Sequence, residues 1–140
     1  MNGELVEGQL THSVIGAFYE VYNALGYGFL ERAYMSALEH ELRTRGHAVS
    51  REVAVPVSYK GRDIGTQRLD MVVGGAVIVE AKSTEILHPS ASRQLFSYLR
   101  ATQMEVGLLL HFGPKPRFYR VFCTGRKEPG SPHEMSARSD

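Results

Sequence analysis

Cysteine, tryptophan and long apolar runs are scarce or missing in this sequence of 140 residues, which has one cysteine and no tryptophan. Cys123 has no second cysteine for an internal disulfide, so the sequence fits a reducing cytoplasm. The longest apolar runs, 71–79 and 106–110, fall far below the roughly 20 residues that span a membrane. The N-terminus is acidic and lacks the basic and apolar segments of a signal peptide. We therefore expect a soluble cytoplasmic protein with no membrane partner.

An excess of charge of one sign is also missing, because 16 lysines and arginines balance 15 acidic residues to give a formal charge of +1. Any binding of phosphate must therefore come from local clusters rather than from a global basic field. The histidines and Cys123 show no zinc-ligand spacing, and the glycines form no phosphate-binding loop. His111, at the end of an apolar run, is expected to be a satisfied structural histidine.

Hydrophobic periodicity predicts a mixed α/β protein. The expected elements are helices at 8–25, 30–45 and from Pro89 onward, and strands at 53–59, 64–73, 77–82, 106–110 and 117–123. Because strand–helix–strand crossovers are right-handed, strand 106–110 should lie parallel to strand 77–82. Pro56 lacks an N–H group and so places the first strand at an edge of the sheet.

One domain is expected over residues 1–124, since this length can bury a core of its own. Residues 125–140 are polar and rich in glycine, proline and serine. That composition predicts a disordered tail.

Three charged residues, Asp70, Glu80 and Lys82, interrupt an otherwise apolar hairpin. Burying an unpaired charge costs several kcal/mol, so these three charged side chains are expected to have a structural or functional role. Glu80 and Lys82 are two apart and project from the same face of their strand. A two-residue Gly-Gly turn would put Asp70 and Glu80 on opposite faces, whereas a three-residue Gly-Gly-Ala turn would set them opposite each other. The sequence leaves both turns open.

Facing carboxylates destabilise a strand pair unless a cation lies between them. Mg²⁺ prefers oxygen ligands and commonly takes one or two carboxylates in proteins. Lys82, one pleat beyond Glu80, could position an attacking water or neutralise charge on a phosphate. The alternative interpretation is a solvated sheet face that carries a weak Glu–Lys ion pair.

Two further pairs of residues bear on the choice between a metal site and a solvated sheet face. Glu31 and Tyr34 share a face at the start of the second helix, although a glutamate there is commonly only a favourable partner of the helix dipole. Gln94 and Tyr98 are four apart on the helical face that should pack on the sheet. A glutamine on a buried face needs hydrogen-bond partners, which the charged strand face could provide. A glutamine at the rim and a core tyrosine are the alternative.

Taken together, these residues resemble the GxxExxY protein family, which is placed within the PD-(D/E)XK nuclease superfamily. The resemblance spans about residues 9–122 and rests on G-x-x-E-x-x-Y at Gly28, Glu31 and Tyr34, R-L-D at Asp70, V-E-A-K at Glu80 and Lys82, and Q-x-x-x-Y at Gln94 and Tyr98. It implies a restriction-endonuclease-like αβββαβ core, here with an extra N-terminal helix and a C-terminal edge strand.

The resemblance also implies roles for these side chains. Asp70 and Glu80 would bind Mg²⁺ or Mn²⁺, with Glu31 as an additional acidic ligand near the metal. Lys82 would be the catalytic lysine, and Gln94 and Tyr98 would shape the site and contact the nucleic-acid strand.

The function predicted on this basis is a divalent-metal-dependent nuclease that hydrolyses phosphodiester bonds, with DNA expected rather than RNA. Arg68, Arg93 and Arg100 are candidates for binding its phosphates. A small nuclease that cuts both strands would usually act as a homodimer. The alternative is a non-catalytic module on the same fold that binds nucleic acid or protein; a third interpretation is an interaction subunit whose charged cluster is a structural network.

Overall fold

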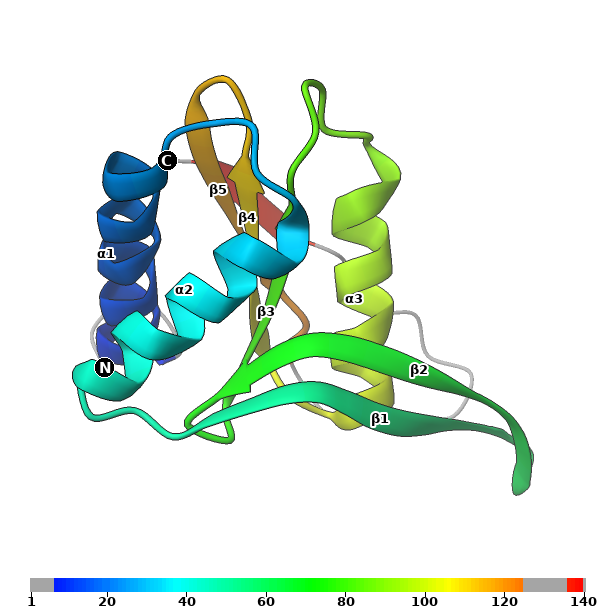
Figure 1. Ribbon diagram of the computed structural model, residues 1–140. Helices are drawn as coiled ribbons and strands as arrows, with labels where there is room; N and C mark the ends of the chain where they lie inside the picture. The colour runs from blue at the N-terminus through cyan, green and yellow to red at the C-terminus, as the bar shows by residue number, and fades with distance from the viewer. Residues whose placement is uncertain (1–6, 125–135, 140) are drawn as a thin grey trace.

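The computed structural model describes residues 7–124 and 136–139, and Figure 1 shows how they fold. In chain order the elements are α1 (Gly8–Leu25), α2 (Glu31–Thr44), β1 (Val49–Tyr59), β2 (Arg62–Val73), β3 (Val77–Lys82), α3 (Ser90–Thr102), β4 (Val106–Phe112), β5 (Pro116–Phe122) and β6 (Ser136–Ser139). All three predicted helices and all five predicted strands are present. The first helix and the third strand have the predicted bounds.

The strands form one mixed sheet in the order β1-β2-β3-β4-β5-β6. β3 and β4 are parallel, as predicted from the crossover through α3, and the other neighbours are antiparallel. β1 lies at one edge of the sheet, which is where Pro56 can be accommodated without the loss of a ladder hydrogen bond.

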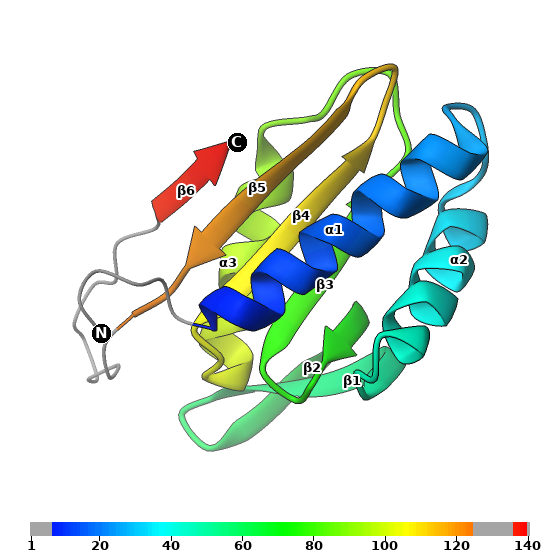
Figure 2. The ribbon, with the colours of Figure 1, turned by 90° about the vertical axis from the view of Figure 1, so that its left-hand side faces the viewer.

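Helices cover both faces of the sheet, with α1 and α2 on one side and α3 on the other (Figure 2). The two layers of core follow from strand alternation: Val79 packs toward α1 and α2, whereas Ile78 packs toward α3. β4 is buried along its whole length, and β3 is buried up to Lys82. A buried central pair of strands is why both sequences read as nearly continuous apolar runs.

The strand predicted at the C-terminal edge is β5, and β6 pairs along its outer side. The sequence predicts a disordered tail over 125–140, and for residues 136–139 that prediction is wrong. Backbone pairing with β5 needs no apolar alternation, so the composition of this segment gave no sign of a strand. Residues 125–135 and 140 of the predicted tail lie outside the described residues.

The turn between β2 and β3 settles how the charged residues face each other. Val73 pairs with Val77, so the connection is the three-residue turn of Gly74, Gly75 and Ala76. Both glycines have positive φ, 61° and 65°, which a residue with a Cβ rarely adopts. The register continues through Val72–Ile78 and Met71–Val79, and the next residues along the two strands are Asp70 and Glu80.

β2 stays beside β3 for only these three pairs and then follows β1 away from the sheet. Figure 1 shows the long β1–β2 hairpin curving under α3 and ending in a tip that projects past it. The residues of β2 before Leu69 are accordingly exposed. Within the described residues, no helix is both long enough and apolar enough to cross a membrane.

The turn allows a direct test of this register. Gly75 has φ +65° with open space around its missing Cβ, so Gly75→Ala adds backbone strain without a clash. We predict that Gly75→Ala lowers the free energy of unfolding by about 1 kcal/mol, because a left-handed conformation costs about that much in residues with a Cβ. Gly75→Asn should cost less, since asparagine tolerates this conformation. Urea unfolding measures both; equal costs for alanine and asparagine would contradict the assigned turn.

Candidate active site

The candidate site begins where β2 and β3 separate. The backbone N–H of Asp70 donates to Glu80 Oε2 at 2.9 Å, and the backbone N–H of Ala81 donates to Asp70 Oδ2 at 3.1 Å. Each carboxylate therefore accepts a backbone N–H from the opposite strand, beyond the last backbone pair of the β2–β3 ladder. The two side chains are held between the diverging strands, with their positions fixed by backbone donors.

Glu80 is the more buried acid of this pair, with 6% of its surface exposed. Burial, followed by the charge of Asp70, raises the pKa of Glu80 from 4.5 to about 8; the Asp70 N–H and the Lys82 ammonium act in the opposite direction. A buried carboxyl beside a second carboxylate holds a proton near neutral pH because two negative charges repel there. The site is thus short of positive charge.

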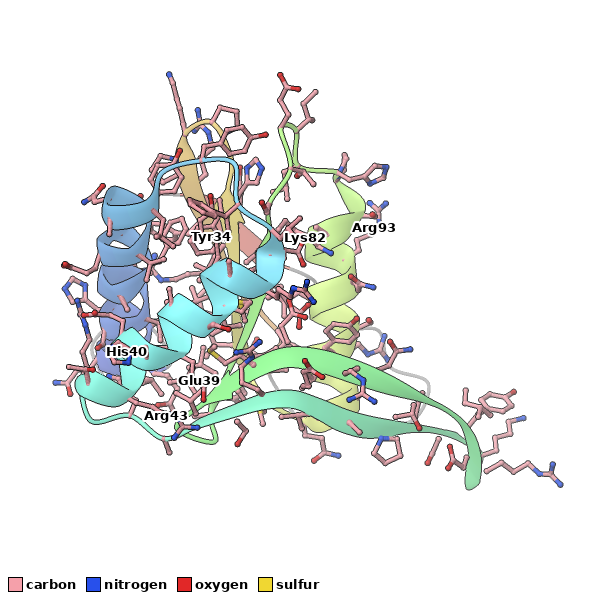
Figure 3. The ribbon with its side chains drawn as sticks, in the orientation of Figure 1. Tyr34, Glu39, His40, Arg43, Lys82 and Arg93 are labelled. Atoms are coloured by element: carbon pink, nitrogen blue, oxygen red, sulfur yellow. The ribbon has the colours of Figure 1, made fainter. Side chains whose placement is uncertain are left out.

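Lys82 and Tyr98 meet the acids on the α3 side of the sheet. Strand alternation puts Glu80 and Lys82 on the same face as Ile78, which packs against α3. Figure 3 shows Lys82 in the space between α2 and α3. Tyr98 is buried, and its pKa is raised by burial first and then by Glu80 and Asp70. Tyr98 therefore lies within the electrostatic reach of both acids.

Glu31 approaches from the other side, on the first turn of α2. The backbone N–H of Ser83, the residue that follows β3, is close enough to its carboxylate to favour the charged form. Burial raises the pKa of Glu31, Lys82 lowers it, and Asp70 raises it. Glu31 therefore lies within the electrostatic reach of both other charged residues, at the gap that the departure of β2 opens beside β3.

Ser83 is a site residue that the sequence interpretation missed. Its backbone N–H lies near the Glu31 carboxylate, and its hydroxyl donates to the carbonyl oxygen of Phe29 at 2.6 Å. This serine ties the end of β3 to the segment that enters α2. The only sequence signal is a hydroxyl directly after V-E-A-K, and a single serine beside a motif is too common to stand out.

Tyr34 is a structural part of the same assembly. Its hydroxyl donates to the Gly26 carbonyl and accepts the Phe29 N–H at 3.2 Å. Its ring stacks on Phe112 with centroids 4.1 Å apart and is fully buried. Tyr34 thus holds the loop before α2, and with it the position at which Glu31 enters the site.

His111 supports the chain after Lys82 from the neighbouring strand. It is level with Lys82 in the parallel ladder, is buried, and its Nε2 lies 2.7 Å from the Thr84 carbonyl oxygen. This is the satisfied strand-end histidine that the sequence predicts. It fixes the backbone that leaves the site at Thr84.

Gln94 differs from the expectation that it lies on the buried face of α3. That face consists of Ala91, Leu95, Phe96, Tyr98 and Leu99, while Gln94 is exposed. It lies at the margin of the face, one turn before Tyr98, because a helical period places it beside the apolar stripe rather than within it. Gln94 is thus near the site but open to solvent.

The three predicted phosphate-binding arginines are all exposed and occupy different elements. Arg68 on β2 donates to the Glu52 carbonyl at 3.3 Å. Arg93 lies on the outer side of α3 (Figure 3). Arg100, two turns further along, lines a hollow of about 410 Å³ between α3 and the edge strand β1.

The donor chemistry of the site fits a hard divalent cation. Two carboxylates meet in a buried place where one of them keeps a proton, and a cation that replaced this proton would remove their repulsion. Among the residues that the structure describes, no three His, Cys, Asp or Glu side chains form a ligand cluster. Asp70 and Glu80 are therefore brought together as predicted, whereas Glu31 lies nearby without completing a three-ligand set.

The raised pKa of Glu80 predicts a pH dependence of stability. Between about 4.5 and about 8 the folded protein holds a proton at Glu80 that the unfolded chain has released. In a chelating buffer, the free energy of unfolding should therefore fall as pH rises through this range, by up to about 1.4 kcal/mol for each pH unit. Glu80→Gln should remove this fall, whereas the surface control Glu20→Gln should keep it. Urea unfolding at several pH values measures the slope; identical slopes in all three proteins would refute the assignment.

Comparison with known proteins agrees with this geometry. The family model of the PD-(D/E)XK nuclease superfamily matches residues 8–121 of the chain. No curated protein and no solved structure matches it. All of the predicted site residues fall within the matched region, and the mixed α/β architecture is consistent with a restriction-endonuclease-like fold. The chain belongs to the PD-(D/E)XK nuclease superfamily.

Proposed function

We propose that this protein is a divalent-metal-dependent nuclease that hydrolyses phosphodiester bonds, with DNA as its preferred substrate. Superfamily membership supports nuclease activity and a nucleic-acid substrate. The observation that carries the metal dependence is the buried Glu80 carboxyl, bonded to the Asp70 backbone and repelled by the Asp70 carboxylate. Such a pair is costly to keep unless a cation binds there during function.

We also propose that the chain is a member of the GxxExxY family within this superfamily. The physical roles of the three motif positions support this assignment. Gly28 has φ +120°, a conformation that suits glycine, in the loop before α2. Glu31 lies on the first turn of α2 beside the end of β3, and Tyr34 holds the loop that carries Gly28 and leads to Glu31.

In the proposed reaction, Asp70 and Glu80 would hold Mg²⁺ or Mn²⁺, which would supply positive charge where negative charge develops on the phosphate. Lys82 projects from the same strand face as Glu80, so its ammonium can donate a hydrogen bond to the attacking water or to a phosphate oxygen. Glu31 has a raised pKa and can accept a proton near the attacking water. Tyr98, buried on α3 within the electrostatic reach of Glu80 and Asp70, would help to orient the pair.

The exposed polar residues would hold the nucleic-acid backbone. Arg100 lines the hollow between α3 and β1, and Gln94 and Arg93 lie on the same helix toward its N-terminus. With Arg68 on β2, these side chains could contact phosphates on the α3 side of the site. Residues 1–124 would form the nuclease domain, and a homodimer would allow both strands of a duplex to be cut.

A non-catalytic binding module is the second candidate. Two observations favour it: within the described part of the chain only two acids cluster, and the formal charge is only +1. Such a module would bind nucleic acid or protein through the same surface without cutting. Cleavage assays separate the two candidates directly.

We predict that Glu80→Gln and Lys82→Ala each lower the rate of DNA cleavage in Mn²⁺ by about 100-fold or more, since single groups that stabilise developing charge contribute on this scale. Agarose-gel and labelled-oligonucleotide assays measure the rates. Glu20→Gln and Lys60→Ala are matched controls, because both residues are exposed and lie on α1 and at the hairpin tip.

A chelator should abolish cleavage by the wild type as completely as Glu80→Gln does. Circular dichroism and urea unfolding establish that the variants are folded. If both site variants keep wild-type cleavage rates, the proposed mechanism is wrong. If the wild type binds DNA but does not cut it with any divalent cation, the binding module is the better description.

A further inference from the structure

Four large apolar side chains remain exposed around the end of β3. Tyr27, Phe29 and Leu30 belong to the loop between α1 and α2, and Ile86 belongs to the loop between β3 and α3. Their exposed fractions run from 46% to 80%. Figure 1 shows both loops at the same end of the molecule, beyond the C-terminal end of β3. We call this set the apolar rim.

The apolar rim is joined directly to the candidate site. Leu30 precedes Glu31, and Ser83, which follows Lys82, donates its hydroxyl to the Phe29 carbonyl at 2.6 Å. In the second loop, the Thr84 hydroxyl donates to the Ile86 carbonyl at 2.8 Å. Any polymer whose backbone lies over Asp70, Glu80 and Lys82 would therefore have its adjacent units next to these side chains.

The backbone that carries Phe29 is held in place. Its N–H donates to the Tyr34 hydroxyl, its carbonyl accepts from Ser83, and the Tyr34 ring meets the Phe29 ring edge-on at 6.0 Å. The Phe29 ring nevertheless stays 48% exposed. A fixed backbone that keeps an aromatic ring in solvent is suited to binding, because little conformational freedom remains to be lost when a ligand arrives.

Basic groups accompany the apolar rim. Arg32 follows Glu31 on α2, and Arg93 lies in the first turn of α3; both are exposed. Glu85 is an exposed acid in the same region. Aromatic and apolar surfaces beside cationic side chains are the combination that binds single-stranded nucleic acid, where bases stack and phosphates pair with cations. Bases inside a duplex are already stacked on one another and do not offer their faces.

We infer that the apolar rim is a stacking platform for unpaired nucleotides, with Phe29 as its central ring, and that the substrate is single-stranded nucleic acid or the frayed end of a duplex. This inference rests on the proposed nuclease function and specifies its substrate class. Phe29 and its neighbours contact bases next to the scissile phosphate, while Lys82 and the carboxylate pair act on the phosphate itself.

The test compares a single-stranded oligonucleotide with an abasic oligonucleotide of the same length and phosphate count. Fluorescence anisotropy measures both affinities in the Glu80→Gln background, where cleavage does not interfere. The base-containing strand should bind roughly 5- to 150-fold more tightly, the range expected for stacking of one base. Phe29→Ala should remove most of this difference and leave the affinity for the abasic strand unchanged, whereas Phe29→Trp should keep the difference.

Tyr59→Ala is the matched control, because Tyr59 is a 57% exposed aromatic residue near the tip of the β1–β2 hairpin, away from the apolar rim. It should preserve the preference for bases. In the wild-type background, Phe29→Ala should also lower the ratio of single-strand to duplex cleavage. Persistence of the full preference for bases in Phe29→Ala would overturn the platform.

Two other outcomes would also reject the inference and are distinguishable. If the wild type cuts DNA but Phe29→Ala leaves the base preference unchanged and converts a dimer to a monomer in sedimentation velocity, the apolar rim is an interface between two copies. If the wild type neither binds nor cuts any nucleic acid, the proposed function fails, and the platform fails with it.

Discussion

The hydrogen-bond ladder between β2 and β3 stops at the pair Met71–Val79, and the arrangement of the site depends on what replaces it. Beyond that pair, the N–H groups of Asp70 and Ala81 are bonded by the carboxylates of Glu80 and Asp70. The strands can separate without leaving these backbone donors unpaired, which would be costly in a buried place. The same exchange holds two acids beside each other where burial raises the pKa of Glu80 to about 8. Separation of the strands and assembly of the carboxylate pair are therefore one structural event.

Where β2 leaves the edge of β3, the segment that leads into α2 lies beside the end of β3. The Glu31 carboxylate lies near the backbone N–H of Ser83, the residue after β3, and the Ser83 hydroxyl donates to the Phe29 carbonyl. Tyr34, stacked on Phe112, fixes this segment against the core. The spacing of Gly28, Glu31 and Tyr34 thus has a structural explanation. The glycine allows the turn before α2, the glutamate approaches the end of β3, and the tyrosine, one helical turn later, anchors the segment in the core. Such support from buried groups is what a site needs to keep reactive side chains in position.

Much of this architecture could be predicted from the sequence, because periodicity and crossover handedness determine the helices, the strands and the parallel placement of β4. The register of β3 could not be predicted: both of its faces are buried, so no polar alternation selects between the two possible turns. Periodicity also placed Gln94 on the buried face of α3, since it cannot separate the centre of a stripe from its margin. The contact between Ser83 and Phe29 joins residues 54 apart and follows from tertiary packing alone. The catalytic roles of the six site residues stay predictions.

Metal binding by the carboxylate pair is the central claim, and a thermal melt of the wild type and Glu80→Gln in Mg²⁺ and Mn²⁺ tests it most directly. A ligand at about 100 times its dissociation constant stabilises the native state by about 2.7 kcal/mol, a clear rise in melting temperature for a domain of this size. The account predicts that both cations stabilise the wild type and that neither stabilises Glu80→Gln. Equal stabilisation of both proteins, or none of either, would contradict a cation site built on Asp70 and Glu80.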